Sequence, residues 1–162
     1  MRALTATFLT LTLLLFSAKE GLSADFRKGL DAYNRGDYAT ALLEWKPLAE
    51  QGLAEAQHHI GFLYDDGQGV PENDKTAVKW YTLAAEQGYA AAQTNLGVMY
   101  STGQGVVQDI VYAYLWVSMA AANGNELGEK LKGAFARLLT PSQTVEVQRL
   151  ARECIEKNYK NC

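Results

Sequence analysis

The chain has 162 residues, of which 48% are hydrophobic and 20% are charged, and it contains only three prolines. This composition favours one compact domain and excludes a disordered chain. The formal net charge of −3 and the absence of any block of basic residues argue against nucleic acid as a partner.

The first segment, residues 1–24, has the pattern of a cleaved secretory signal peptide. Arg2 precedes an apolar, threonine-containing run that is shorter than the roughly 20 residues of a membrane-spanning helix. We expect cleavage after Ala24, with a site one residue earlier as the alternative. The mature protein would then be periplasmic or secreted, with no stable membrane insertion.

Residues 25–52 are predicted to form an N-terminal hairpin of two antiparallel helices, a degenerate version of the units that follow. Gly36 and Asp37 supply the turn between the helices. The second helix has an apolar inner face made of Ala41, Leu42, Trp45 and Leu48.

The two following segments, 53–88 and 89–124, are copies of each other at a fixed period of 36 residues. The stretch GFLYDDGQGV starts at Gly61, and GVMYSTGQGV starts at Gly97. Within each copy the apolar residues recur three or four apart, which indicates a pair of amphipathic helices. The GQGV segment is then the turn between the two helices of one unit, where glycines allow positive φ.

Individual residues define the ends of these helices. Asn73 and Asp109 stand where a side-chain oxygen would cap the second helix of each unit. Gly61 and Gly97 lie inside the first helices, where glycine costs about 1 kcal/mol of helix propensity. We therefore expect the facing helix to approach too closely for a β-carbon, through Ala77 or Trp80 in the first copy.

The stretch AEAQHHIGFLYDDGQGVPENDKTAVKWYTLAAEQG resembles the Sel-one-like repeat, a relative of the tetratricopeptide repeat. His59 departs from the asparagine usual at its position, which Asn95 keeps, and Val107 replaces the proline that Pro71 keeps. The resemblance implies an all-α fold, a right-handed α-solenoid of antiparallel helical hairpins with about eight helices. It also implies a protein that scaffolds complexes or takes part in envelope and host-interaction processes.

Residues 125–162 are predicted to form C-terminal helices that cap the solenoid. Thr140, Pro141 and Gln143 have the pattern of a helix start with a capping box. The last helix is expected to cover the preceding helix pair with an apolar stripe made of Val147, Leu150, Ala151, Cys154 and Ile155.

The two cysteines, Cys154 and Cys162, are expected to form a disulfide in an oxidising compartment. In an unbroken helix they would lie roughly 12 Å apart, which is too far to bond, so the helix must end near Asn158. Two unpaired thiols or an intermolecular bond are the alternatives.

Signals for a metal or phosphate site are weak. Asp65, Asp66 and Asp74 lack the spacing of a calcium loop, and the second copy has Ser101 and Thr102 instead of the first two. Neither copy has the lysine and hydroxyl residue of a phosphate-binding loop. We expect no metal and no small-molecule cofactor.

A catalytic function is also poorly supported. His58 and His59 are the only histidines, so a zinc site would need ligands from far along the chain. No serine is followed three residues later by lysine, which excludes the nucleophile motif of penicillin-interacting enzymes. We expect no catalytic residue. A cell-envelope enzyme or a direct peptidoglycan ligand is the alternative, and a pocket with converging carboxylates would favour the enzyme.

Helical solenoids bind partners on extended concave faces. We therefore predict an exported, non-catalytic adaptor that binds another protein or a peptide on the face made by the first helices of successive hairpins. An ordinary solvated helix face is the alternative at each position. The predicted binding residues are Lys28, Asp31, Arg35, His59, Phe62, Asp66, Asn95, Val98 and Thr102.

Overall fold

The structure is a computed structural model that describes residues 25–160 and residue 162, so the predicted signal segment lies outside the described part. Every regular element of the described part is a helix, which confirms the all-α prediction. Residues 25–34 form the first helix. The others are α2 (Tyr38–Glu50), α3 (Ala54–Asp65), α4 (Asp74–Ala85), α5 (Ala90–Thr102), α6 (Ile110–Ala122), α7 (Glu126–Ala136) and α8 (Pro141–Glu156).

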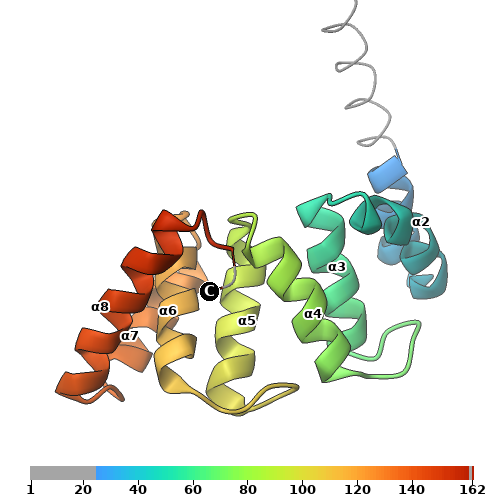
Figure 1. Cartoon of the computed structure of the whole chain (residues 1–162). Coiled ribbons are helices and arrows are strands. Elements are labelled where there is room, and N and C mark those ends of the chain that lie inside the picture. Colours follow the sequence, from blue (N-terminus) through green and yellow to red (C-terminus); the bar gives the residue numbers. More distant parts are fainter. Residues whose placement is uncertain (1–24, 161) are drawn as a thin grey trace, which may run out of the picture.

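The helices form an α-solenoid of antiparallel hairpins (Figure 1). From α2 to α7, each helix packs against the next one along the chain, so that α3 and α4 form one hairpin and α5 and α6 form the next. The array runs from the first helix and α2 at one end to α7 and α8 at the other (Figure 1).

The predicted helix caps are present. The Asn73 side chain accepts a hydrogen bond from the Thr76 amide at 2.9 Å, which closes the start of α4. The Asp109 side chain accepts from the amides of Val111 and Tyr112 at the start of α6. These bonds satisfy amides that have no partner within the helix.

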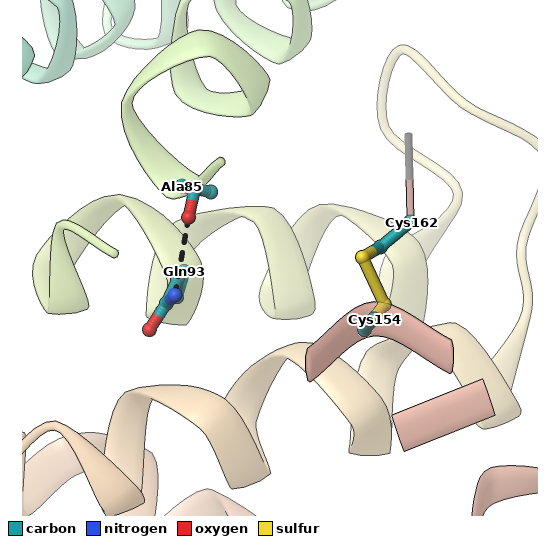
Figure 2. Close-up of a disulfide and its surroundings, with 4 residues drawn as sticks. All are labelled: Ala85, Gln93, Cys154 and Cys162. Atoms are coloured by element: carbon teal, nitrogen blue, oxygen red, sulfur yellow. Dashed lines mark hydrogen bonds between the residues drawn. A yellow bond between two sulfur atoms is a disulfide. The ribbon is translucent and has the colours of Figure 1, made fainter. Parts of the chain in front are cut away.

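Two buried glutamines connect each repeat to its neighbour. Gln93 on α5 donates from Nε2 to the carbonyl of Ala85 at the end of α4, at 3.1 Å (Figure 2). The Oε1 atom of the same side chain accepts a hydrogen bond from Asn123, just after α6, at 3.0 Å. Gln57 occupies the same place in the preceding unit and accepts from Gln87 at 2.7 Å. Each glutamine therefore joins the ends of two successive hairpins.

The predicted close approach at the mid-helix glycines is present. A β-carbon on Gly61 would lie 2.6 Å from Cδ1 of Tyr81, and one on Gly97 would lie 2.6 Å from Cγ1 of Val117. Both distances are too short for real atoms. The nearest atoms to Gly61 belong to Tyr81, the residue after the tryptophan, and not to the two residues suggested by the sequence, Ala77 and Trp80.

The same contact appears in the N-terminal hairpin but not at the other end of the array. A β-carbon on Gly29 would lie 2.3 Å from Nε1 of Trp45, which is fully buried. Gly133 on α7 is one period after Gly97, yet no heavy atom lies within 4 Å of a β-carbon placed there. The C-terminal helix pair, α7 and α8, is therefore open at this point.

Helix α8 explains the opening, because it packs against α6 rather than closing onto α7. Val147 and Cys154 are buried in the core, and Leu150 and Ala151 are half-buried against it. Ile155 is 66% exposed, so its predicted place in the covered stripe is wrong. The reason is that α8 covers one helix and not a helix pair.

The chain reverses after α8 and returns to the core. Asn158 and Tyr159 both have positive φ, at 52° and 66°, and the Tyr159 amide donates to the Cys154 carbonyl at 2.8 Å. This reversal brings the Cα atoms of Cys154 and Cys162 to 5.4 Å, and a disulfide joins the two residues (Figure 2).

Candidate binding face

The predicted binding residues lie on three successive first helices, which are neighbours in space. The rings of Tyr33 on the first helix and Phe62 on α3 are 6.3 Å apart. The amide nitrogen of Asn95 on α5 lies 3.4 Å from Nε2 of His58 on α3. We call the surface carried by residues 25–35, α3 and α5 the first-helix face.

The N-terminal part of the first-helix face is charged and exposed. Lys28, Asp31 and Arg35 all lie in solvent. Lys28 pairs with Asp25 at 2.8 Å, and this hydrogen bond and the Asp25 charge raise the pKa of the Lys28 amine. Such exposed pairs contribute little to stability, so these charges remain available to a partner.

His59 is a packing residue more than a surface residue. Its ring stacks on Trp45 with a centroid distance of 4.6 Å and lies 5.5 Å from the ring of Phe26. Burial lowers the pKa of the His59 imidazole, which favours the neutral ring. His59 therefore helps to join the N-terminal hairpin to α3, and it is a poor candidate for a freely accessible anchor.

Phe62 on α3 and Asp66, the C-cap residue that follows this helix, are more accessible than His59. Phe62 is half-buried, lies edge-on to Tyr33 and packs partly against the core of the next unit. Asp66 follows one helical turn later and is exposed. The pair presents an aromatic edge beside a negative charge.

The predicted residues on α5 form the polar end of the first-helix face. Val98 is half-buried, and its carbonyl accepts hydrogen bonds from the hydroxyls of Ser101 and Thr102 at 2.7 and 3.1 Å. The Thr102 hydroxyl also lies 2.9 Å from Oε1 of Gln104. These groups satisfy one another, so this end offers fewer free polar atoms than the N-terminal end.

A buried polar network behind the first-helix face was not predicted. Asn95 donates to Nε2 of His58, and the His58 ring lies 5.8 Å from Tyr81 and 5.2 Å from Tyr89. Burial lowers the pKa of the His58 imidazole to about 4. The hydroxyl of Tyr81 donates to Asp65 at 3.1 Å, and burial raises the pKa of that carboxyl group.

The His58 ring in this network is neutral at pH 7, because burial holds its pKa at about 4. Nε2 of His58 faces the side-chain amide of Asn95, and its Nδ1 atom is buried and has no partner in the described part. One sequence feature could have indicated this polar network. His58 in the first copy and Asn95 in the second occupy neighbouring positions of the repeat, and both have polar side chains.

One cavity at the C-terminal end does not gather carboxylates. It has a volume of about 630 Å³ and lies between the start of α6, the end of α7 and the start of α8. Asp109 is the only carboxylate among the described residues that line it, and Asp109 already caps α6. The described residues also contain no group of three potential metal ligands.

Comparison with known proteins identifies the repeats. The Sel1 repeat model matches residues 54–89 and 90–125, each one residue later than the boundaries read from the duplication. The chain contains two Sel1 repeats. No curated protein matches it significantly.

Two solved structures are similar to this chain. The crystal structure of c5321, "a protective antigen present in uropathogenic Escherichia coli strains displaying an SLR fold", has a TM-score of 0.79 and 28% sequence identity, over 88% of this chain and 32% of that chain. A Sel1 repeat protein from Oxalobacter formigenes has a TM-score of 0.63 and 38% identity, over 65% of this chain and 44% of that chain. The chain matches less than half the length of either protein.

The family sets a general role. Sel1 repeat proteins are generally scaffolds for interactions between proteins. Within the described part of this chain, no helix is both long and apolar enough to cross a membrane.

Proposed function

We propose that this protein is an exported, non-catalytic adaptor that binds another protein or a peptide on the first-helix face. The proposal rests on the general role of the repeats and on the mixture of charged and aromatic groups on this face. The disulfide and the signal-like N-terminal sequence support export, because disulfides persist in oxidising compartments.

One observation carries the proposal, namely the partly exposed Phe62 ring beside the exposed Asp66 carboxylate. Binding energy at protein interfaces concentrates in a few aromatic or charged residues surrounded by weaker contacts. Phe62 is held against Tyr33, which limits the entropy that its ring loses on binding. The exposed carboxylates of Asp31 and Asp66 would orient a basic partner segment toward this ring.

The experiment is capture of partners from the exporting compartment with the tagged protein as bait. We expect Phe62→Ala combined with Asp66→Lys to abolish capture while the far-ultraviolet circular dichroism and the melting temperature stay close to those of the parent. Leu83→Ala is the matched control, since Leu83 is 46% exposed but lies on α4, a second helix. His59 is left unchanged because it stacks on the buried Trp45.

Two results would contradict the proposal. If capture survives the double change at Phe62 and Asp66 but fails with Leu83→Ala, the partner binds to the second helices. If the purified protein cleaves peptidoglycan fragments, the protein is an envelope enzyme and not an adaptor.

A further inference from the structure

The two glycine-rich loops make the same contact with the preceding hairpin. A β-carbon on Gly69, in the loop of residues 66–73, would lie 2.7 Å from the carbonyl carbon of Tyr38 at the start of α2. A β-carbon on Gly105, in the loop of residues 103–109, would lie 2.5 Å from the carbonyl carbon of Asp74 at the start of α4. Each loop therefore covers the first residues of a second helix.

In both loops, the residues that cover the start of the helix are a glycine and the valine that follows it. Gly69 and Gly105 have φ values of 73° and 68°, which side chains other than that of glycine rarely allow. The next residues, Val70 and Val106, are half-buried and pack against the two hydrophobic cores. A segment that fits this place therefore has a glycine in the left-handed conformation followed directly by an aliphatic residue.

The equivalent place at the start of α6 has no such loop over it. The connection between α7 and α8 consists only of residues 137–140. At one period after Gly105 the chain has Pro141, which is the first residue of α8. The cavity of about 630 Å³ lies here and is lined by Ile110, Val111 and Leu138 among others.

We propose that this cavity, which we call the α6 seat, binds a loop of a partner protein that carries glycine followed by an aliphatic residue. The partner loop would take the place that a third repeat loop would occupy. The α6 seat is the position equivalent, one period later, to an interface that the chain itself forms twice, at α2 and α4. It lies on other elements than the first-helix face, so the proposal does not depend on that face.

The lining of the α6 seat favours this occupant over an anion or a charged peptide. The Asp109 carboxylate already accepts from two amides of α6, and Gln108 donates to the Ser101 carbonyl at 2.8 Å. The polar groups are thus occupied by the chain itself. Half of the residues that line the seat are apolar, namely Ile110, Val111, Phe135 and Leu138, and these are the side chains that a partner loop would cover.

A cyclic peptide containing residues 100–109 of this chain is a suitable probe. The Asp109 amide donates to the Tyr100 carbonyl at 2.9 Å, so the two ends of the loop are already in contact and head-to-tail closure preserves its shape. We expect titration of the ¹⁵N-labelled protein with this peptide to shift the amide resonances of Ile110, Val111 and Leu138. A peptide with Gly105→Val should bind about tenfold more weakly or worse, as is typical of steric overpacking.

Changes in the protein complete the test. Leu138→Asp should weaken binding of the peptide, since Leu138 is 64% exposed and lines the seat. Leu127→Asp is the matched control, because Leu127 lies near the other end of α7 and is 53% exposed. Phe62→Ala should leave peptide binding unchanged. No shifts at the seat, equal binding of the two peptides, or equal effects of Leu138→Asp and Leu127→Asp would overturn the proposal.

Discussion

Gln57 receives a hydrogen bond from Gln87 at 2.7 Å, although the two residues are separated by a complete helical hairpin. The same side chain donates to the carbonyl of Ala49 at 2.9 Å, so one buried amide holds α2, α3 and the end of α4 together. Gln93 repeats this arrangement one unit later. The next equivalent residue is Glu129, which is exposed and whose carboxylate side chain has no N–H group to donate. The arrangement therefore ends where the two sequence copies end.

The first prediction concerns this buried amide. Gln93→Leu should lower the free energy of unfolding by about 1–3 kcal/mol, because it removes two hydrogen bonds, one to the Ala85 carbonyl and one from the Asn123 amide, and leaves each of these groups with only its bond to Gly88. Chemical denaturation measures the change. Gln104→Leu, in an exposed loop position, is the control and should have little effect. Equal stability of the Gln93 variant and the parent would show that water replaces the lost bonds.

The second prediction compares two glycines at the same position of successive units. Gly97→Ala should destabilise the protein by roughly 1–3 kcal/mol, because the new methyl group would meet Val117 and lie 3.0 Å from the Ala113 carbonyl oxygen. Gly133→Ala should stabilise it by about 0.5–1 kcal/mol, since the position is helical and open. Thermal and chemical denaturation distinguish the two. Changes of the same sign would mean that α8 closes over Gly133 in solution.

The third prediction is a pH dependence of stability. The His58 pKa is about 4 in the folded protein and about 6.5 in the unfolded chain, so the unfolded chain binds more protons between these values. The neutral folded form is fully favoured above pH 6.5, and this stability is lost as the pH falls toward 4. At pH 5 the loss should be about 2 kcal/mol relative to pH 7.

His58→Gln is the control for this dependence, because the amide cannot titrate. Its free energy of unfolding should fall by about 2 kcal/mol less than that of the parent between pH 7 and pH 5. Denaturant titrations at several pH values test the difference. If the free energy of unfolding has the same pH dependence in both proteins, protonation of His58 does not destabilise the folded state. The remaining slope of the variant includes His59, whose lowered pKa acts in the same direction.

The fourth prediction concerns the cysteines. Non-reducing peptide mapping should recover Cys154 and Cys162 in one linked peptide. Reduction should lower the free energy of unfolding by about 2 kcal/mol, the amount expected for a short closed loop. Cys162→Ser should have the stability of the reduced parent and should not respond to reductant. Free thiols or a covalent dimer in the mapping experiment would contradict this pairing.

The period and the caps were sufficient to predict the hairpins. Asn73 and Asp109 cap the helices that their positions indicated, because capping depends only on local geometry. Contacts between helices were harder to predict from the sequence. The alignment could not show whether Tyr81 or Trp80 faces Gly61, since a rotation of about 100° about the helix axis exchanges them.

The candidate face was predicted by helical stepping, which identifies a face but not its exposure. His59 shows the limit, because its burial depends on the Trp45 ring of another hairpin. The position of α8 could not be predicted either, since its apolar stripe could pack against one helix as well as against a pair. Val147 and Cys154 are buried against α6, and Ile155 of the same stripe is in solvent.

The loop contacts make the array extensible by whole repeats. A further copy of residues 90–125 inserted after residue 125 would place its own glycine loop over the start of α6. Its glutamine would stand opposite the carbonyl of Ala121, as Gln93 stands opposite Ala85. The loop contact and the glutamine contact would then both use residues that already form these contacts in the existing repeats. Helices α7 and α8 would move together to the end of the longer array. The helices α7 and α8 could therefore cap a longer array as they cap this one. Duplication of a repeat could lengthen the solenoid without changing the contacts between the existing repeats.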